Sequence, residues 1–240
     1  DRSVSRGLGD VYKRQLHILP HWNWKGREGE ITPVVVYTSY PQAELFVNGK
    51  SMGVRKKVDS GMLDYAEVAK TPYWERDRVQ HIQDRNDSLA MNRYRLIWDD
   101  VVYQPGEVKV VAMDDAGKPV EERTVRTAGK AHHIVLSANR KEIVADGNDL
   151  VYVTVNVADK DGNIVPDDNR MVKFKVSGAA EFLATANGDP TCLLSFDRPE
   201  MKLFSGAATA ILRAASTPGK AELTVSAPGV RPATIVIDVK

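Results

Sequence analysis

The chain has 240 residues, of which 42% are hydrophobic and 27% are charged, a balance typical of a globular protein with one large domain or two small ones. Its 33 basic and 32 acidic residues give a net charge of +1, which excludes the basic surface of a nucleic-acid-binding protein or a polybasic membrane anchor. The single cysteine excludes an internal disulfide, and no stretch approaches the ~18 apolar residues of a membrane-spanning helix.

The first fifteen residues have neither helical nor strand periodicity. They resemble the translated adapter peptide that is often found at the ends of metagenomic gene fragments, and a short natural linker is the alternative. We therefore expect residues 1–15 to be a non-native or disordered leader that does not belong to the fold.

A β-hairpin is predicted early in the chain. An apolar run over 43–47 leads into Asn-Gly at 48–49, and a return strand over 50–56 follows, with Met52 and Val54 on one face. Asn-Gly is a strong hairpin signal because a type I′ turn needs positive φ at both central positions.

Further strand patterns lie on both sides of this hairpin. In the segment 92–98, Tyr94, Leu96 and Trp98 are expected on one face. The polar segment 59–88 shows weak alternation and is interpreted as a long connection. Other strands of the first half are expected at 34–37, 108–113 and 120–127.

The pattern beyond a junction at 127–131 is cleaner. Four valines, Val151, Val153, Val155 and Val157, alternate with polar or aromatic residues, as a half-buried strand requires. A hairpin turn is expected at 159–163, and further strands at 172–176, 181–186, 207–213, 221–227 and 234–239. Short strands with turns at this spacing predict an all-β fold with two immunoglobulin-like β-sandwich domains in tandem.

The run His-Ile-Leu-Pro-His-Trp-Asn-Trp at 17–24, together with the hairpin over 43–51, resembles the point where the catalytic barrel of a family 2 glycoside hydrolase ends and its C-terminal sandwiches begin. The stretches 145–150, 157–163 and 186–190 resemble an invasin-type bacterial immunoglobulin-like domain. The resemblance implies a post-barrel domain over 16–128 and an invasin-type domain over 131–240.

The same resemblance implies the activity of the parent protein. It would be a β-galactosidase-like enzyme of Bacteroidetes that hydrolyses β-glycosidic bonds with retention, and it would be periplasmic or secreted. A retaining glycosidase needs two carboxylates about 5 Å apart. No alternation of β and α elements indicates a barrel, and no glutamate lies in a matching motif, so we assign no catalytic residue to this chain.

Several other motifs favour ordinary structural roles. The segment 159–163 is not an EF-hand, since Ile164 and Arg170 stand where that loop needs glycine and glutamate. We interpret it as a solvent-facing turn, the pair His132-His133 as an exposed linker and Cys192 as a small buried apolar residue. We therefore expect neither a metal nor a cofactor.

Aromatic residues are the candidates for ligand contact. In a strand, Trp22 and Trp24 would share one face and could form a platform on which a sugar stacks. They could equally pack in the core or between domains, because tryptophan contributes a large buried area. Trp74, in the long connection, leaves the same two options open.

The sequence therefore favours scaffold domains of a glycosidase, whose partner would be the missing barrel or a second copy in a homodimer. The alternatives are a carbohydrate-binding or adhesive module that contacts an oligosaccharide, and an adhesin with tandem repeats. The two halves share no sequence repeat, which counts against a simple array.

Overall fold

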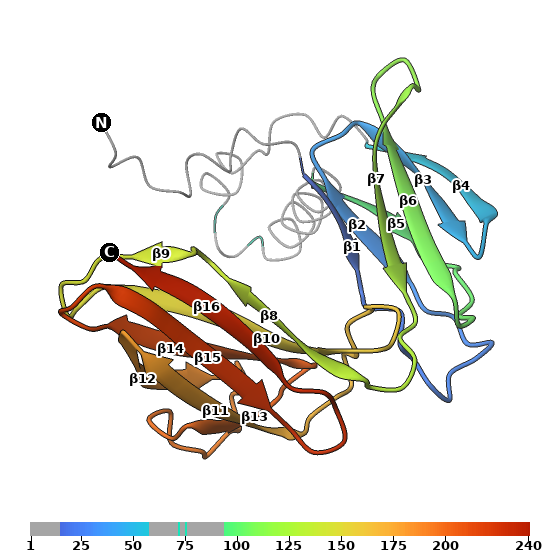
Figure 1. Ribbon diagram of the computed structural model, residues 1–240. Coiled ribbons are helices and arrows are strands. Elements are labelled where there is room, and N and C mark those ends of the chain that lie inside the picture. Colours follow the sequence, from blue (N-terminus) through green and yellow to red (C-terminus); the bar gives the residue numbers. More distant parts are fainter. Residues whose placement is uncertain (1–14, 58–71, 73–74, 76–93) are drawn as a thin grey trace. The chain divides into compact units, whose positions relative to one another are not determined.

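The computed structural model describes residues 15–57, 72, 75 and 94–240, and every element named within these ranges is a β-strand (Figure 1). The chain divides into two compact units, Asp1–Thr127 and Ala128–Lys240. The predicted all-β fold with two tandem sandwiches is confirmed. The expected leader, except Gln15, and nearly all of the expected connection over 59–88 lie outside the described residues.

Unit 1 contains two antiparallel sheets, with the orders β1-β2-β5 and β4-β3-β6-β7. Side chains from both sheets form one buried cluster, which includes Trp98, Leu45 and Val110. The strands are β1 (Leu16–Leu19), β2 (Val34–Thr38), β3 (Gln42–Val47), β4 (Lys50–Lys56), β5 (Arg95–Trp98), β6 (Glu107–Met113) and β7 (Pro119–Arg126).

Unit 2 contains a sheet with the order β12-β14-β10-β8 and a second with the order β13-β11-β15-β16-β9, in which β16 and β9 pair in parallel. The strands are β8 (His133–Ala138), β9 (Glu142–Ile143), β10 (Leu150–Ala158), β11 (Met171–Gly178), β12 (Ala180–Ala186), β13 (Glu200–Lys202), β14 (Ala207–Ala214), β15 (Gly219–Ser226) and β16 (Ala233–Val239). The four valines of β10 are fully buried, as their alternation predicted.

The hairpin of β3 and β4 turns at Asn48 and Gly49, with φ values of 49° and 80°, as the Asn-Gly signal predicted. The predicted face of the return strand is wrong, because the register shifts between Glu44 and Phe46 and an extra residue of β4 bulges at Gly53. Met52 packs against the core, whereas Val54 is 42% exposed.

The strand predicted over 92–98 begins later in the structure. β5 starts at Arg95, so Leu96 and Trp98 point into the core as expected. Tyr94 precedes the strand and is 60% exposed, so its predicted place on the same buried face is wrong. The alternation of three aromatic and apolar residues therefore extended the prediction beyond the ladder that holds the strand.

Candidate functional site

The segment that carries the two candidate tryptophans is a loop. β1 ends at Leu19, a cis peptide bond joins Leu19 to Pro20, and the residues from Pro20 to Trp24 form no strand. Without the period of a strand, nothing places the two indoles on one face. The strand assumed for this run is therefore wrong.

Trp22 is a core residue of unit 1. Its side chain is 1% exposed, its indole Nε1–H donates to the backbone oxygen of Gln104 at 2.9 Å, and its ring lies edge-on to Tyr103 at 5.1 Å between centroids. Its backbone oxygen accepts a hydrogen bond from the hydroxyl of Thr127. A buried indole with its polar atom paired offers no face for stacking on a sugar.

Trp24 has a different environment. It is half-buried, the ring of His21 stacks on it at 4.4 Å, and the guanidinium carbon of Arg27 lies 5.3 Å from its ring centroid. Its Nε1–H is buried and has no hydrogen-bond partner among the described residues. Trp74, the third candidate, lies outside the described residues.

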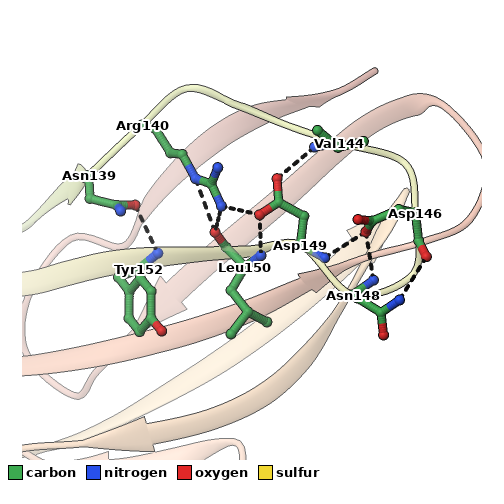
Figure 2. Close-up of polar contacts among 8 residues, drawn as sticks. All are labelled: Asn139, Arg140, Val144, Asp146, Asn148, Asp149, Leu150 and Tyr152. Atoms are coloured by element: carbon green, nitrogen blue, oxygen red, sulfur yellow. Dashed lines mark hydrogen bonds and ion pairs between the residues drawn. The ribbon is translucent and has the colours of Figure 1, made fainter. Parts of the chain in front are cut away.

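The loop over 145–150 is closed by its own carboxylates (Figure 2). Asp146 accepts hydrogen bonds from the backbone N–H groups of Asn148 at 2.8 Å and Asp149 at 2.7 Å. Asp149 accepts from the backbone of Val144 at 2.8 Å and from Arg140, and these bonds lower the pKa of the Asp149 carboxyl. The motif that supported the resemblance therefore positions the start of β10.

Asp159 lies in the turn predicted at 159–163, but the prediction that this turn faces solvent is wrong at this residue, which is 2% exposed. Its carboxylate accepts from the backbone N–H groups of Gly129 at 2.7 Å, Asp161 at 2.9 Å and Asn163 at 2.9 Å, and from the Asn163 amide at 3.0 Å. Burial opposes ionisation, but these bonds outweigh it and hold the pKa of Asp159 at about 2. Reading the turn as a local feature missed this residue.

The carboxyls with shifted pKa values do not suit acid catalysis. A general acid needs a raised pKa, whereas the hydrogen bonds from Thr191 lower the pKa of Asp189, in the same direction as Asp149 and Asp159. Within residues 15–57, 72, 75 and 94–240, no group of three potential metal-ligating side chains is found.

A depression of about 530 Å³ in unit 2 is lined mainly by small residues. Its charged groups are Glu181 and Arg213, which neutralise each other, with 2.6 Å between Oε1 and Nε. No aromatic side chain lines it. The residues are Gly147, Gly178, Ala180, Glu181, Arg213, Ala214, Ala215 and Ser216.

Two minor predictions fall on described residues. Cys192 is half-buried and packs against the core, with its sulfur 3.9 Å from that of Met201, so it is less buried than expected. His132 is exposed, but His133 belongs to β8 and is half-buried, so the pair is only in part an exposed linker. No helix among the described residues is long and apolar enough to cross a membrane.

Comparison with known families assigns both halves of the chain. Residues 134–236 match the family "Glycoside hydrolase family 2 C-terminal domain 5", and residues 29–121 match a domain of unknown function, DUF4982. The β-galactosidase BoGH2A of Bacteroides ovatus is 36% identical over 225 residues, which are 94% of this chain and 22% of that protein. The chain belongs to glycoside hydrolase family 2.

Other relatives place this family 2 chain in the same context. A β-galactosidase of Thermoanaerobacter pseudethanolicus is 25% identical over 62% of the chain and 18% of its own length. A β-glycosidase structure from Bacteroides vulgatus superposes with a TM-score of 0.76 at 26% identity, covering 95% of this chain and 25% of that one. The chain thus spans about a quarter or less of the length of these relatives.

Proposed function

We propose that this chain supplies two scaffold domains to a family 2 glycoside hydrolase of the β-galactosidase type. The whole enzyme hydrolyses β-glycosidic bonds with retention, on carboxylates that this chain does not contribute. The observation that carries the proposal is the 36% identity to a β-galactosidase over 94% of the chain. Further support comes from the carboxyls with shifted pKa values, which are ionised acceptors held by hydrogen bonds.

The buried state of Trp22 favours the scaffold over a carbohydrate-binding or adhesive module. A binding module needs aromatic faces open to solvent, whereas the Trp22 ring is enclosed and the Trp24 ring is stacked by His21. Sugar contact by Trp22, Trp24 or Trp74 would require these side chains to be free, and the hydrogen bond from Trp22 to Gln104 counts against it.

The partners and location follow from the same proposal. The principal partner is the catalytic barrel of the same polypeptide, and a second copy of the chain is the other candidate. The location that fits the Bacteroides relatives is the periplasm or the exterior of the cell, where carbohydrate polymers are hydrolysed.

Hydrolysis of a chromogenic β-galactoside tests the proposal. The purified chain should release no chromophore above the uncatalysed rate, whereas the full-length enzyme that contains it should turn over. Hydrolysis by the chain alone, abolished by substitution of one of its own carboxylates, would refute the scaffold role.

A further inference from the structure

The last residue of unit 1 is held firmly to that unit. The backbone N–H of Thr127 donates to the oxygen of Gly106 at 2.8 Å, and the N–H of Gly106 donates to the Thr127 hydroxyl oxygen at 3.0 Å. The same hydroxyl donates to the backbone oxygen of Trp22, a core residue. Three hydrogen bonds therefore end unit 1 at Thr127.

The first residues of unit 2 are held as firmly to their own unit. The Ala128 and Ala131 side chains pack against the unit 2 core. Between them, the backbone N–H of Gly129 donates to the buried carboxylate of Asp159, with 2.7 Å between nitrogen and oxygen. A hydrogen bond to an ionised acceptor is among the stronger ones.

We propose that Thr127 and Asp159 are the anchors of a short hinge between the two units, which confines bending of the chain to the backbone bonds between Thr127 and Gly129. Asp159 acts from the β10–β11 turn, thirty residues away in sequence, and so belongs to the junction rather than only to its own turn. Without it, the next backbone hydrogen bond that holds the chain to unit 2 is from His132 to Ala158, at 2.8 Å.

The inference goes beyond the scaffold function and explains why a buried carboxylate is kept at this turn. Asp159 would close its hairpin turn with the N–H groups of Asp161 and Asn163 alone. Its fourth donor, Gly129, lies outside the turn, and the low pKa of Asp159 keeps this acceptor ionised across the neutral range.

Limited proteolysis with trypsin tests the hinge, because Lys130 is exposed and lies just beyond the anchored Gly129. In Asp159→Asn, cleavage after Lys130 should rise about tenfold, since loss of a charge-assisted hydrogen bond raises local opening by about that factor. Asp161→Asn is the matched control, because Asp161 lies in the same turn and its side chain is 66% exposed; it should cleave as the parent chain does.

Mass spectrometry of the fragments separates local release from unfolding. A rise at Lys130 that exceeds the rise at Lys173 and Lys220, both in strands of unit 2, supports the hinge. An equal rise at all three sites, or no rise, overturns it. Amide exchange of the unaltered chain is a second test: protection of the Gly129 N–H by tenfold or more is expected, and exchange at the rate of an unstructured peptide would overturn the proposal.

Discussion

Trp22 and Trp24 are two indoles of one loop with opposite hydrogen-bonding states. The N–H of Trp22 is paired with Gln104, whereas that of Trp24 is buried without a partner among the described residues. Burial of an unpaired donor costs free energy, so Trp24 is retained at a cost that its packing with His21 and Arg27 offsets.

The paired substitutions Trp22→Phe and Trp24→Phe remove the same atoms from the two sites. Trp22→Phe should lower the free energy of unfolding by about 2–4 kcal/mol, because it creates a cavity and leaves the Gln104 oxygen unpaired. Trp24→Phe should cost less than about 1 kcal/mol, because it also removes an unpaired donor. Urea unfolding followed by circular dichroism measures both values, and equal losses would contradict the assignment.

Asp159 predicts how stability changes with pH. Because its pKa falls from an ordinary 3.8 to about 2 on folding, the carboxylate stabilises the fold above about pH 4, and this contribution is lost as the pH falls through 2. A shift of this size corresponds to about 2 kcal/mol at neutral pH. Asp159→Asn should remove most of the difference between unfolding free energies measured at pH 6 and pH 2.5. An unchanged difference in that variant would contradict the low pKa.

At the scale of elements, the hairpin between β11 and β12 turns at Gly178, where φ is +84°. A Cβ added there would lie 2.0 Å from the backbone oxygen of Lys220, which cannot move without disturbing β15. Gly162 has a similar φ of +87°, but a Cβ there would meet nothing within 4 Å. The two glycines therefore separate backbone strain from steric overlap.

Gly178→Ala should lower the free energy of unfolding by more than about 3 kcal/mol, since it combines a left-handed backbone with an overlap. Gly162→Ala is the matched control and should cost about 1–2 kcal/mol from the backbone term alone. Thermal unfolding compares the two variants. Equal melting temperatures would mean that β15 moves away from the added methyl group.

Local patterns predicted the strands wherever one face is buried. The alternation in β10 and the turn at Asn48-Gly49 both follow from nearest-neighbour chemistry. The failures lie where tertiary pairing intervenes: the bulge at Gly53 redirects Val54, the ladder excludes Tyr94, and β1 ends before the tryptophans. Asp159 could not be predicted as buried, because its fourth donor comes from Gly129, far away in sequence.

At the scale of the molecule, the sheet β1-β2-β5 carries apolar side chains on the face away from the core. Leu19 pairs with Val35, and Val35 with Ile97, in one row across the three strands. Leu19 and Tyr37 are each 41% exposed. An antiparallel sheet usually places polar residues on its solvated face, so this face suits contact with another surface.

The isolated chain should therefore self-associate or aggregate. Sedimentation velocity over a range of protein concentrations should reveal species larger than the 26.5 kDa monomer. Tyr37→Lys should reduce this association, whereas Val120→Lys, a change of an exposed valine in β7, should not. A monodisperse monomer at all concentrations would count against the prediction.

The central claim is that this chain serves a catalytic barrel that it does not contain. The most direct measurement is to sequence the source DNA upstream of the codon for Leu16. We predict an open reading frame that encodes a family 2 barrel, with two glutamates at the C-terminal ends of barrel strands. An upstream frame that encodes only further β-sandwich repeats would contradict the account and make the chain part of an adhesin or binding protein.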